Sequence, residues 1–195
     1  MGVTFVRRRR GGEPLVGQMP VRRRDHAYRH LTVVVATLLL PLAALVTGGG
    51  RVRERACEWA FRVRYPFEEL TGLTPGTRAA FIAARSAALW HDAELIGLTS
   101  GHRMYAEQHE LFQEAVRSYG SERSARQWVL PPEESSHVRG RALDVRPTEG
   151  ARWLERNGDR FGLYRTYANE WWHFEYWPEF RGTGKQPPMR PTPGG

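Results

Sequence analysis

Two short segments in the C-terminal half of this chain constrain its fold more strongly than any other feature of the sequence. The first contains His137 and Asp144, and the second contains Glu170 and His173. Two imidazole nitrogens and one carboxylate oxygen suit zinc and leave a fourth tetrahedral position for water. Glu170 precedes the last ligand by three residues and is placed to take a proton from that water. The fold is therefore expected to bring both segments to one zinc site.

The spacing within the first segment is a weak signal by itself, because His and Asp occur by chance at any spacing on protein surfaces. His137 follows a loop, whereas Asp144 belongs to a segment that reads as a strand. The two side chains can converge if the chain turns sharply between them, and Gly140 permits such a turn. The second segment strengthens the hypothesis, because it supplies a third ligand and a base.

The second segment leads into an aromatic stretch, residues 172–177, whose composition and alternation predict a β-strand. Positions 170 and 173 would point to opposite faces of a regular strand. We therefore expect Glu170 in the turn before the strand and His173 at its start. Glu175 and Trp177 would share the face of His173, and the aromatic side chains of the other face would hold this ligand in place.

The order and spacing of these residues resemble a known pattern. Ser-x-His-x-x-Gly-x-Ala-x-Asp begins at Ser135, and Glu-x-x-His ends at His173. The pair resembles the signature of VanY-type D-alanyl-D-alanine carboxypeptidases, zinc enzymes of the LAS metallopeptidase group. Ser-Gly-His-Arg at 100–103 and Phe-Gly-Leu at 161–163 are similar to further elements of that family. The resemblance covers residues 75–180 and is specific, because both halves occur in order.

The resemblance implies His137, Asp144 and His173 as the ligands of a Zn²⁺ ion and Glu170 as the catalytic base of a zinc metallopeptidase. The metal would lower the pKa of its bound water from about 15.7 toward about 7. Glu170 would take a proton as this water attacks the scissile carbonyl and then pass it to the leaving amine. Trp171 departs from the family pattern, which often has Pro there, so the backbone that aims Glu170 lacks the restraint of Pro.

Three further residues receive roles from the resemblance or from their position. Arg103 is implied as a catalytic group that offsets the oxyanion developing on the substrate carbonyl. Gln108 and Ser135 are expected to contact the substrate or to support the site, although each also fits a local cap or turn residue.

The resemblance implies an exported bacterial peptidase that removes the terminal D-alanine from peptidoglycan stem peptides, and we expect it to be a monomer. Cleavage elsewhere in the same peptide, as a D,D-dipeptidase or an L,D-endopeptidase, is an alternative on the same site. A non-catalytic module that binds peptidoglycan and keeps zinc for structure is another alternative. A structural zinc site usually has four protein ligands, and the sequence offers no obvious fourth.

Periodicity and turn residues predict an α+β fold, with helices packed on a small, mainly antiparallel sheet in a single zinc-peptidase domain. We expect a helix capped by Thr77 over residues 78–96 and a second helix ending at Tyr119. The other expected elements are strands at 98–100, 142–145 and 172–177 and short helices at 121–128 and 150–157.

The N-terminal part of the chain predicts export rather than nucleic-acid binding. Eight Arg and two acidic residues within residues 1–30 account for +6 of the net charge of +8, so the basic character belongs to this leader. An apolar run, residues 31–46, is expected to be a cleaved export signal or a membrane anchor, and a buried core helix fits the Arg-rich flank poorly. The lone Cys57 excludes an intramolecular disulfide.

These observations divide the chain into five parts. We expect an Arg-rich region at 1–30, the apolar segment within 31–50, a linker at 51–74, the peptidase domain at 75–180 and a disordered tail at 181–195.

Overall fold

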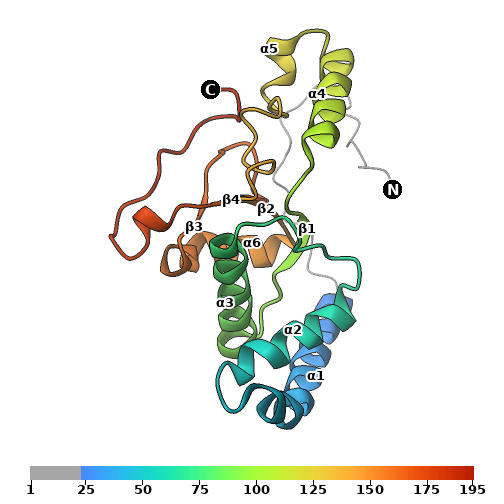
Figure 1. Ribbon diagram of the computed structural model, residues 1–195, viewed down its shortest axis with the longest axis vertical. Coiled ribbons are helices and arrows are strands. Elements are labelled where there is room, and N and C mark those ends of the chain that lie inside the picture. Colours follow the sequence, from blue (N-terminus) through green and yellow to red (C-terminus); the bar gives the residue numbers. More distant parts are fainter. Residues whose placement is uncertain (1–22) are drawn as a thin grey trace.

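A four-stranded sheet forms the centre of the structure, a computed structural model that describes residues 23–195 (Figure 1). Its strands are β1 (Gly97–Ser100), β2 (Ala142–Arg146), β3 (Leu163–Arg165) and β4 (His173–Tyr176). They lie in the order β1-β2-β4-β3, and neighbouring strands are antiparallel. The α+β class and the antiparallel sheet predicted from the sequence are confirmed.

Helices cover one face of this sheet and lie beyond both of its ends (Figure 1). α3 and α6 pack on the sheet, α4 and α5 lie beyond one end of it, and α1 and α2 lie beyond the other. The helical elements of the described residues are α1 (Arg23–Thr47), α2 (Val52–Arg64), α3 (Pro75–Asp92), α4 (Tyr105–Tyr119), α5 (Glu122–Ala125), α6 (Thr148–Asn157), η1 (Gly158–Phe161) and η2 (Pro178–Phe180).

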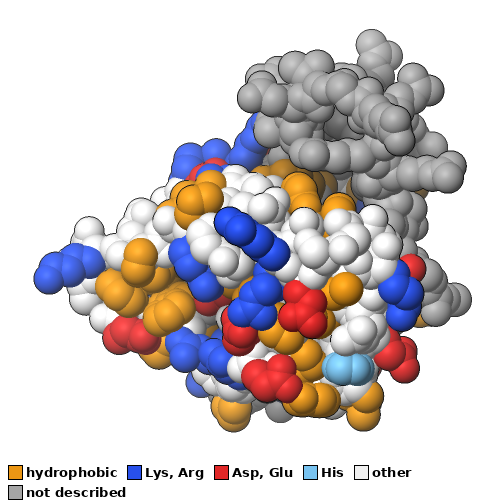
Figure 2. Space-filling view, turned by 90° about the horizontal axis from the view of Figure 1, so that it is seen from above, with side chains coloured by type: hydrophobic (Ala, Val, Ile, Leu, Met, Phe, Trp, Pro, Cys, Tyr) orange, Lys and Arg blue, Asp and Glu red, His pale blue; other side chains and the backbone are white. Residues whose placement is uncertain are grey.

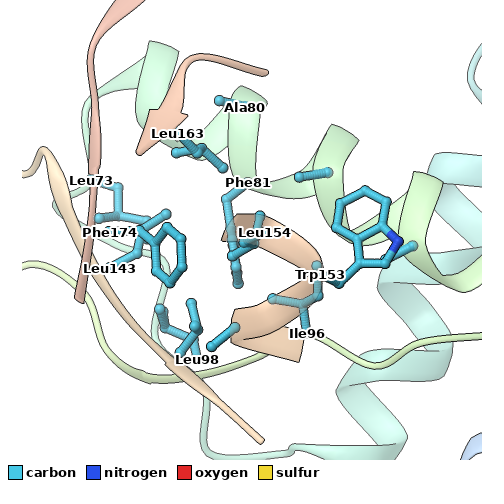
Figure 3. Close-up of a cluster of buried hydrophobic side chains, with 14 residues drawn as sticks. Leu73, Ala80, Phe81, Ile96, Leu98, Leu143, Trp153, Leu154, Leu163 and Phe174 are labelled. Atoms are coloured by element: carbon cyan, nitrogen blue, oxygen red, sulfur yellow. The ribbon is translucent and has the colours of Figure 1, made fainter. Parts of the chain in front are cut away.

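The main hydrophobic core lies between the sheet and the two helices that cover it. Leu143 of β2 and Phe174 of β4 pack there with Phe81 of α3 and Leu154 of α6 (Figure 3). Burying each such side chain contributes about 1.5–3 kcal/mol. Because successive strand residues point to opposite faces, Asp144 and its neighbours in register lie on the other face of the sheet. The core thus fixes the strands whose opposite face carries the candidate site.

The first helix of the expected peptidase domain begins earlier than the sequence predicted. Thr77 was expected to cap a helix over residues 78–96, whereas α3 begins at Pro75 and is capped by Thr74. The Thr74 hydroxyl accepts a hydrogen bond from the Thr77 backbone N–H at 3.1 Å. Pro is favoured at the first helical position, where no N–H is required. The prediction of Thr77 as the cap was therefore wrong.

The other expected strands and helices are present with ends that differ by a few residues, whereas β3, α2 and the short helices η1 and η2 were not predicted. β3 is too short to show a pattern of its own. α2 falls in the expected linker, residues 51–74, yet the structure places it against α1 and α3. Its buried residues are Ala56, Cys57, Ala60 and Phe61. α2 is therefore a packed helix.

α1 contains the apolar run that the sequence assigned to a signal or an anchor. Residues Ala27–Thr47 have a mean hydropathy of 2.1 and are long and apolar enough to cross a membrane. Only 17% of this apolar stretch is buried within the protein, and the side chains of Leu38 and Leu45 are exposed. α1 is therefore not a buried core helix. Most of the Arg-rich region expected at 1–30 lies outside the described residues.

The surface of the described residues mixes both signs of charge. Figure 2 shows basic and acidic side chains interspersed on the face that it presents. The basic pI of 10.3 therefore does not correspond to a continuous basic patch on this face.

Residues 181–195 were expected to be disordered, but the structure gives this segment defined contacts. The Arg190 backbone N–H donates to the Thr166 carbonyl, and the Ala168 N–H donates to the Arg190 carbonyl, each at 2.9 Å. The segment is rich in Gly and Pro, and backbone hydrogen bonds hold it beside residues 166–168.

Candidate metal centre

The register of the sheet brings two of the predicted zinc ligands together. Asp144 on β2 pairs with His173 on β4, and Ser100 at the end of β1 pairs with Asp144 from the other side. His137 lies in the turn segment that leads into β2. All three candidate ligands are buried, and their donor atoms lie within 4.8 Å of one another. The structure thus collects at one point the three side chains that the sequence singled out.

The hydrogen bonds of the two imidazoles fit a metal site. His137 Nδ1 lies 2.6 Å from the Gly101 carbonyl oxygen, which only accepts, so Nδ1 carries the proton and Nε2 is left for a ligand role. Nε2 lies 3.3 Å from Asp144 Oδ1. His173 Nδ1 lies 3.1 Å from the same oxygen, and its Nε2 lies 3.2 Å from Glu175 Oε1. Metal-binding histidines usually give their second nitrogen to a carbonyl or a carboxylate in this way.

The donor set and its geometry therefore suit zinc. Two imidazole nitrogens and one carboxylate oxygen converge, and a three-ligand set of this kind leaves room for a fourth ligand from solvent or substrate.

Gly140 makes the sharp turn between His137 and the strand, as the sequence predicted. Its φ of 66° is in the left-handed region, and an added Cβ would lie 2.4 Å from the Gly72 carbonyl oxygen. The Thr74 N–H also donates to the Gly140 carbonyl at 3.0 Å. A side chain at this position would therefore be strained and would displace the adjoining loop.

Gly140→Ala is expected to destabilise the protein even without metal. The left-handed conformation costs about 1–2 kcal/mol for Ala, and the backbone clash adds roughly 1–3 kcal/mol. Gly120→Ala is the matched control, because Gly120 has a φ of 79° and open space around its missing Cβ. Urea unfolding of both variants should show the larger loss for Gly140, and equal losses would contradict the packing argument.

Glu170 lies in the turn before β4, as expected, and its side chain is buried beside the candidate ligands. Its Oε2 is 3.8 Å from His173 Nδ1. Burial raises the pKa of Glu170 to about 7. The Glu170 backbone N–H donates to the Tyr167 carbonyl, and the His173 backbone N–H donates to the Glu170 carbonyl, both at 3.4 Å. Trp171 packs against the main core, so this turn is supported despite the missing Pro.

Arg103 reaches the site from the loop after β1. Its Nη2 donates to Asp144 Oδ2 at 2.9 Å, a contact that the sequence did not predict. Nε donates to the Ser100 hydroxyl at 3.0 Å, and Nη1 donates to Gln108 Oε1 at 3.3 Å. The side chain is 20% exposed. Among the described residues these bonds use three of its five N–H groups and leave two free.

Gln108 and Ser135 differ in how they relate to the site. Both polar ends of the buried Gln108 amide are used within the protein. Its Oε1 accepts from Arg103 at 3.3 Å, and its Nε2 donates to the Leu130 carbonyl at 2.7 Å. This geometry makes Gln108 a support for Arg103 and does not favour a substrate contact. Ser135 is buried, and its backbone N–H donates to the Pro131 carbonyl at 3.1 Å, which fits a turn residue.

Two residues near the site were not assigned a role from the sequence. Ser136 donates from its hydroxyl to Glu175 Oε1 at 2.8 Å, and Glu175 in turn contacts His173. The signal for Glu175 was its position two residues after His173, which places both on one face of a strand.

The charges at the centre are strongly coupled. Burial lowers the pKa of His137. Burial alone would raise the pKa of Asp144, but His137, His173 and Arg103 outweigh it and hold this pKa well below its usual range. Burial would also lower the pKa of His173, but hydrogen bonds to Asp144 and Glu175 outweigh it and raise this pKa to about 9. Without metal, His173 is therefore protonated at neutral pH.

Zinc binding at pH 7 is accordingly expected to release a proton from His173. A group whose pKa is about 9 holds its proton below that pH, whereas a ligand nitrogen must be deprotonated. The apparent zinc affinity should rise with pH up to about 9. Calorimetric titrations in buffers of different ionisation enthalpy measure the number of protons released, and a value of zero at pH 7 would contradict this protonation state.

An antiparallel sheet that collects a buried His–Asp–His group beside a buried glutamate defines an α+β protein with a candidate mononuclear metal centre. The chain belongs to the VanY D-alanyl-D-alanine carboxypeptidase family, whose model matches residues 71–179. This confirms the resemblance that the two sequence segments indicated.

Similar proteins share part of this chain. A D-alanyl-D-alanine carboxypeptidase of Enterococcus faecalis is 30% identical over 53% of the chain and 46% of its own length. The chain thus spans less than half the length of this relative. The solved structure of VanYB in complex with D-alanine-D-alanine is 27% identical, with a TM-score of 0.50 over 56% of this chain and 75% of that one. A zinc complex of a mutant D,D-pentapeptidase VanY is also 27% identical, with a TM-score of 0.49 over 56% and 76%.

Proposed function

We propose that this protein is a zinc-dependent D-alanyl-D-alanine carboxypeptidase that removes the terminal D-alanine from peptidoglycan stem peptides outside the cytoplasmic membrane. The observation that carries this proposal is the convergence of His137, Asp144 and His173 beside the buried Glu170. Family membership and the complex of the similar VanYB with D-alanine-D-alanine support the choice of substrate.

His137, Asp144 and His173 would hold the zinc ion, which supplies Lewis acidity that activates a water and polarises the scissile carbonyl. Glu170 is the proton carrier in this proposal. Its Oε2 faces His173, and a pKa of about 7 suits a group that accepts and returns a proton at neutral pH. It takes a proton from the attacking water and delivers it to the amine of the departing D-alanine.

Arg103 supplies positive charge at the edge of the site. Its contacts with Ser100, Gln108 and Asp144 fix the guanidinium plane, while two N–H groups remain for an incoming oxygen. A fixed donor of this kind stabilises the negative charge that develops on the carbonyl oxygen during attack.

α1 gives the proposal its location. A helix at Ala27–Thr47 with a mean hydropathy of 2.1 suits either an export signal or a membrane anchor. We infer that either fate, with the Arg-rich flank on the cytoplasmic side, leaves the domain outside the cytoplasmic membrane, where peptidoglycan stem peptides are found.

The test is incubation of the purified chain with a stem pentapeptide ending in D-Ala-D-Ala, with zinc or with a chelator, followed by mass analysis. We expect loss of one alanine in the zinc sample and no loss with chelator. Release of a dipeptide would identify a D,D-dipeptidase, and internal cleavage would identify an endopeptidase. Binding without cleavage in the zinc-loaded sample would identify a non-catalytic module.

A further inference from the structure

Glu175 occupies a position behind the candidate metal centre, on the same face of β4 as His173. Its side chain is 4% exposed. An isolated carboxylate would be costly to bury. The hydrogen-bond partners of Glu175 therefore indicate its role.

Both oxygens of Glu175 are used by donors from separate parts of the chain. Oε1 accepts from the Ser136 hydroxyl at 2.8 Å and from the Tyr167 hydroxyl at 3.2 Å, and it lies 3.2 Å from His173 Nε2. Oε2 accepts from the Trp177 indole N–H at 3.1 Å. Four donors therefore fix this carboxylate in position and orientation.

The network continues from Tyr167 into the C-terminal segment. The Tyr167 ring stacks on the His173 ring, with centroids 4.7 Å apart and an interplanar angle of 27°. Its hydroxyl accepts from Arg190 Nη2 at 2.8 Å, and the Arg190 guanidinium lies 4.7 Å from the Tyr167 ring centroid. Two backbone hydrogen bonds hold Arg190 beside this loop.

From these contacts we propose that Glu175 is the positioning residue for His173, and that the C-terminal segment supports it through Arg190 and Tyr167. The inference rests on the proposed zinc centre. Glu175 accepts the His173 Nε2–H, which fixes the tautomer that aims the Nδ1 lone pair at the site beside Asp144. The stacked Tyr167 ring restricts rotation of the imidazole. Partners of this kind raise the basicity of a ligand and define its orientation.

Glu175→Gln discriminates a positioning role from a purely structural one. A carboxamide has one acceptor oxygen and one donor group, so one orientation turns an N–H toward the Trp177 indole N–H and the other turns an N–H toward His173 Nε2–H. Glu68→Gln is the matched control. Glu68 is a similarly buried carboxylate that pairs with Arg85 at 2.7 Å and belongs to the fold rather than to the site.

The experiment measures the Zn²⁺ affinity of each purified full chain by competition with a fluorescent chelator, together with the visible spectrum of the cobalt-substituted protein. Glu175→Gln should weaken zinc binding by about 10- to 100-fold and change the cobalt spectrum. Glu68→Gln should lower thermal stability without changing either quantity.

Two milder variants keep the test decisive if Glu175→Gln folds poorly. Tyr167→Phe keeps the ring stack and loses the hydroxyl, and Arg190→Ala removes the outer support. Both should weaken zinc binding less than Glu175→Gln but in the same direction, while Arg181→Ala, at an arginine that bonds the Arg160 carbonyl instead, should not.

If the parent binds zinc tightly and Glu175→Gln binds it with the same affinity, this inference alone is overturned. If Glu175→Gln does not fold, unchanged zinc affinity in both milder variants overturns it instead. Absence of zinc binding in the parent would overturn the proposed function and this inference with it.

Discussion

Glu170→Gln is expected to lower kcat for release of D-alanine by about 10²- to 10⁴-fold while the zinc content of the protein stays unchanged. The substitution keeps the shape of the buried side chain and removes the group that accepts the proton. None of the three candidate ligands is altered, so metal binding has no reason to fail. Steady-state kinetics on a stem pentapeptide and metal analysis of the same samples measure both quantities.

Glu179→Gln serves as the control for this experiment, because Glu179 is an exposed carboxylate on η2 that lies outside the site. Its turnover should match the parent. Equal turnover in Glu170→Gln and the parent would remove Glu170 from the mechanism, and loss of zinc from Glu170→Gln would make it a ligand instead of a base.

His137→Ala is expected to abolish both zinc retention and turnover. The imidazole supplies one of three ligands, and its loss leaves the buried Asp144 and His173 as a two-ligand set. In the parent, a zinc concentration of about 1,000 times Kd should stabilise the fold by about 4 kcal/mol through linkage. The melting temperature of His137→Ala should therefore no longer rise when zinc is added.

His91→Ala is the matched control for ligand loss, because His91 is an exposed imidazole near the end of α3. Its melting temperature should respond to zinc as the parent does. If zinc raised the melting temperature of His137→Ala by as much as that of the parent, the metal would bind elsewhere.

The candidate site was more predictable from the sequence than its surroundings. His137, Asp144, Glu170 and His173 belong to two short segments whose order and spacing are local properties of the chain. Gly140 could be interpreted from backbone geometry alone, because a sharp turn was required between a loop and a strand.

Features that depend on strand order and packing were not predicted. Nothing in the local pattern specifies that Asp144 pairs with His173 in register or that Arg103 reaches Asp144. Arg190 illustrates the same limit. Its segment is rich in Gly and Pro, and its role arises from a contact with Tyr167, which is remote in sequence.

The fold class was predictable because hydrophobic alternation marked the strands and turn residues marked the helix ends. α2 was missed because four arginines interrupt the apolar residues of Val52–Arg64. Long side chains of this type keep their charged ends in water while the rest of the helix packs.

X-ray absorption at the zinc edge of the zinc-loaded protein tests the central claim most directly. The account predicts scattering from two imidazoles and from oxygen ligands at about 2.0–2.2 Å, with no sulfur. Loss of imidazole scattering in a His137→Ala, His173→Ala double variant would agree with it. A zinc–sulfur distance of about 2.3 Å, or a parent spectrum without imidazole scattering, would contradict it.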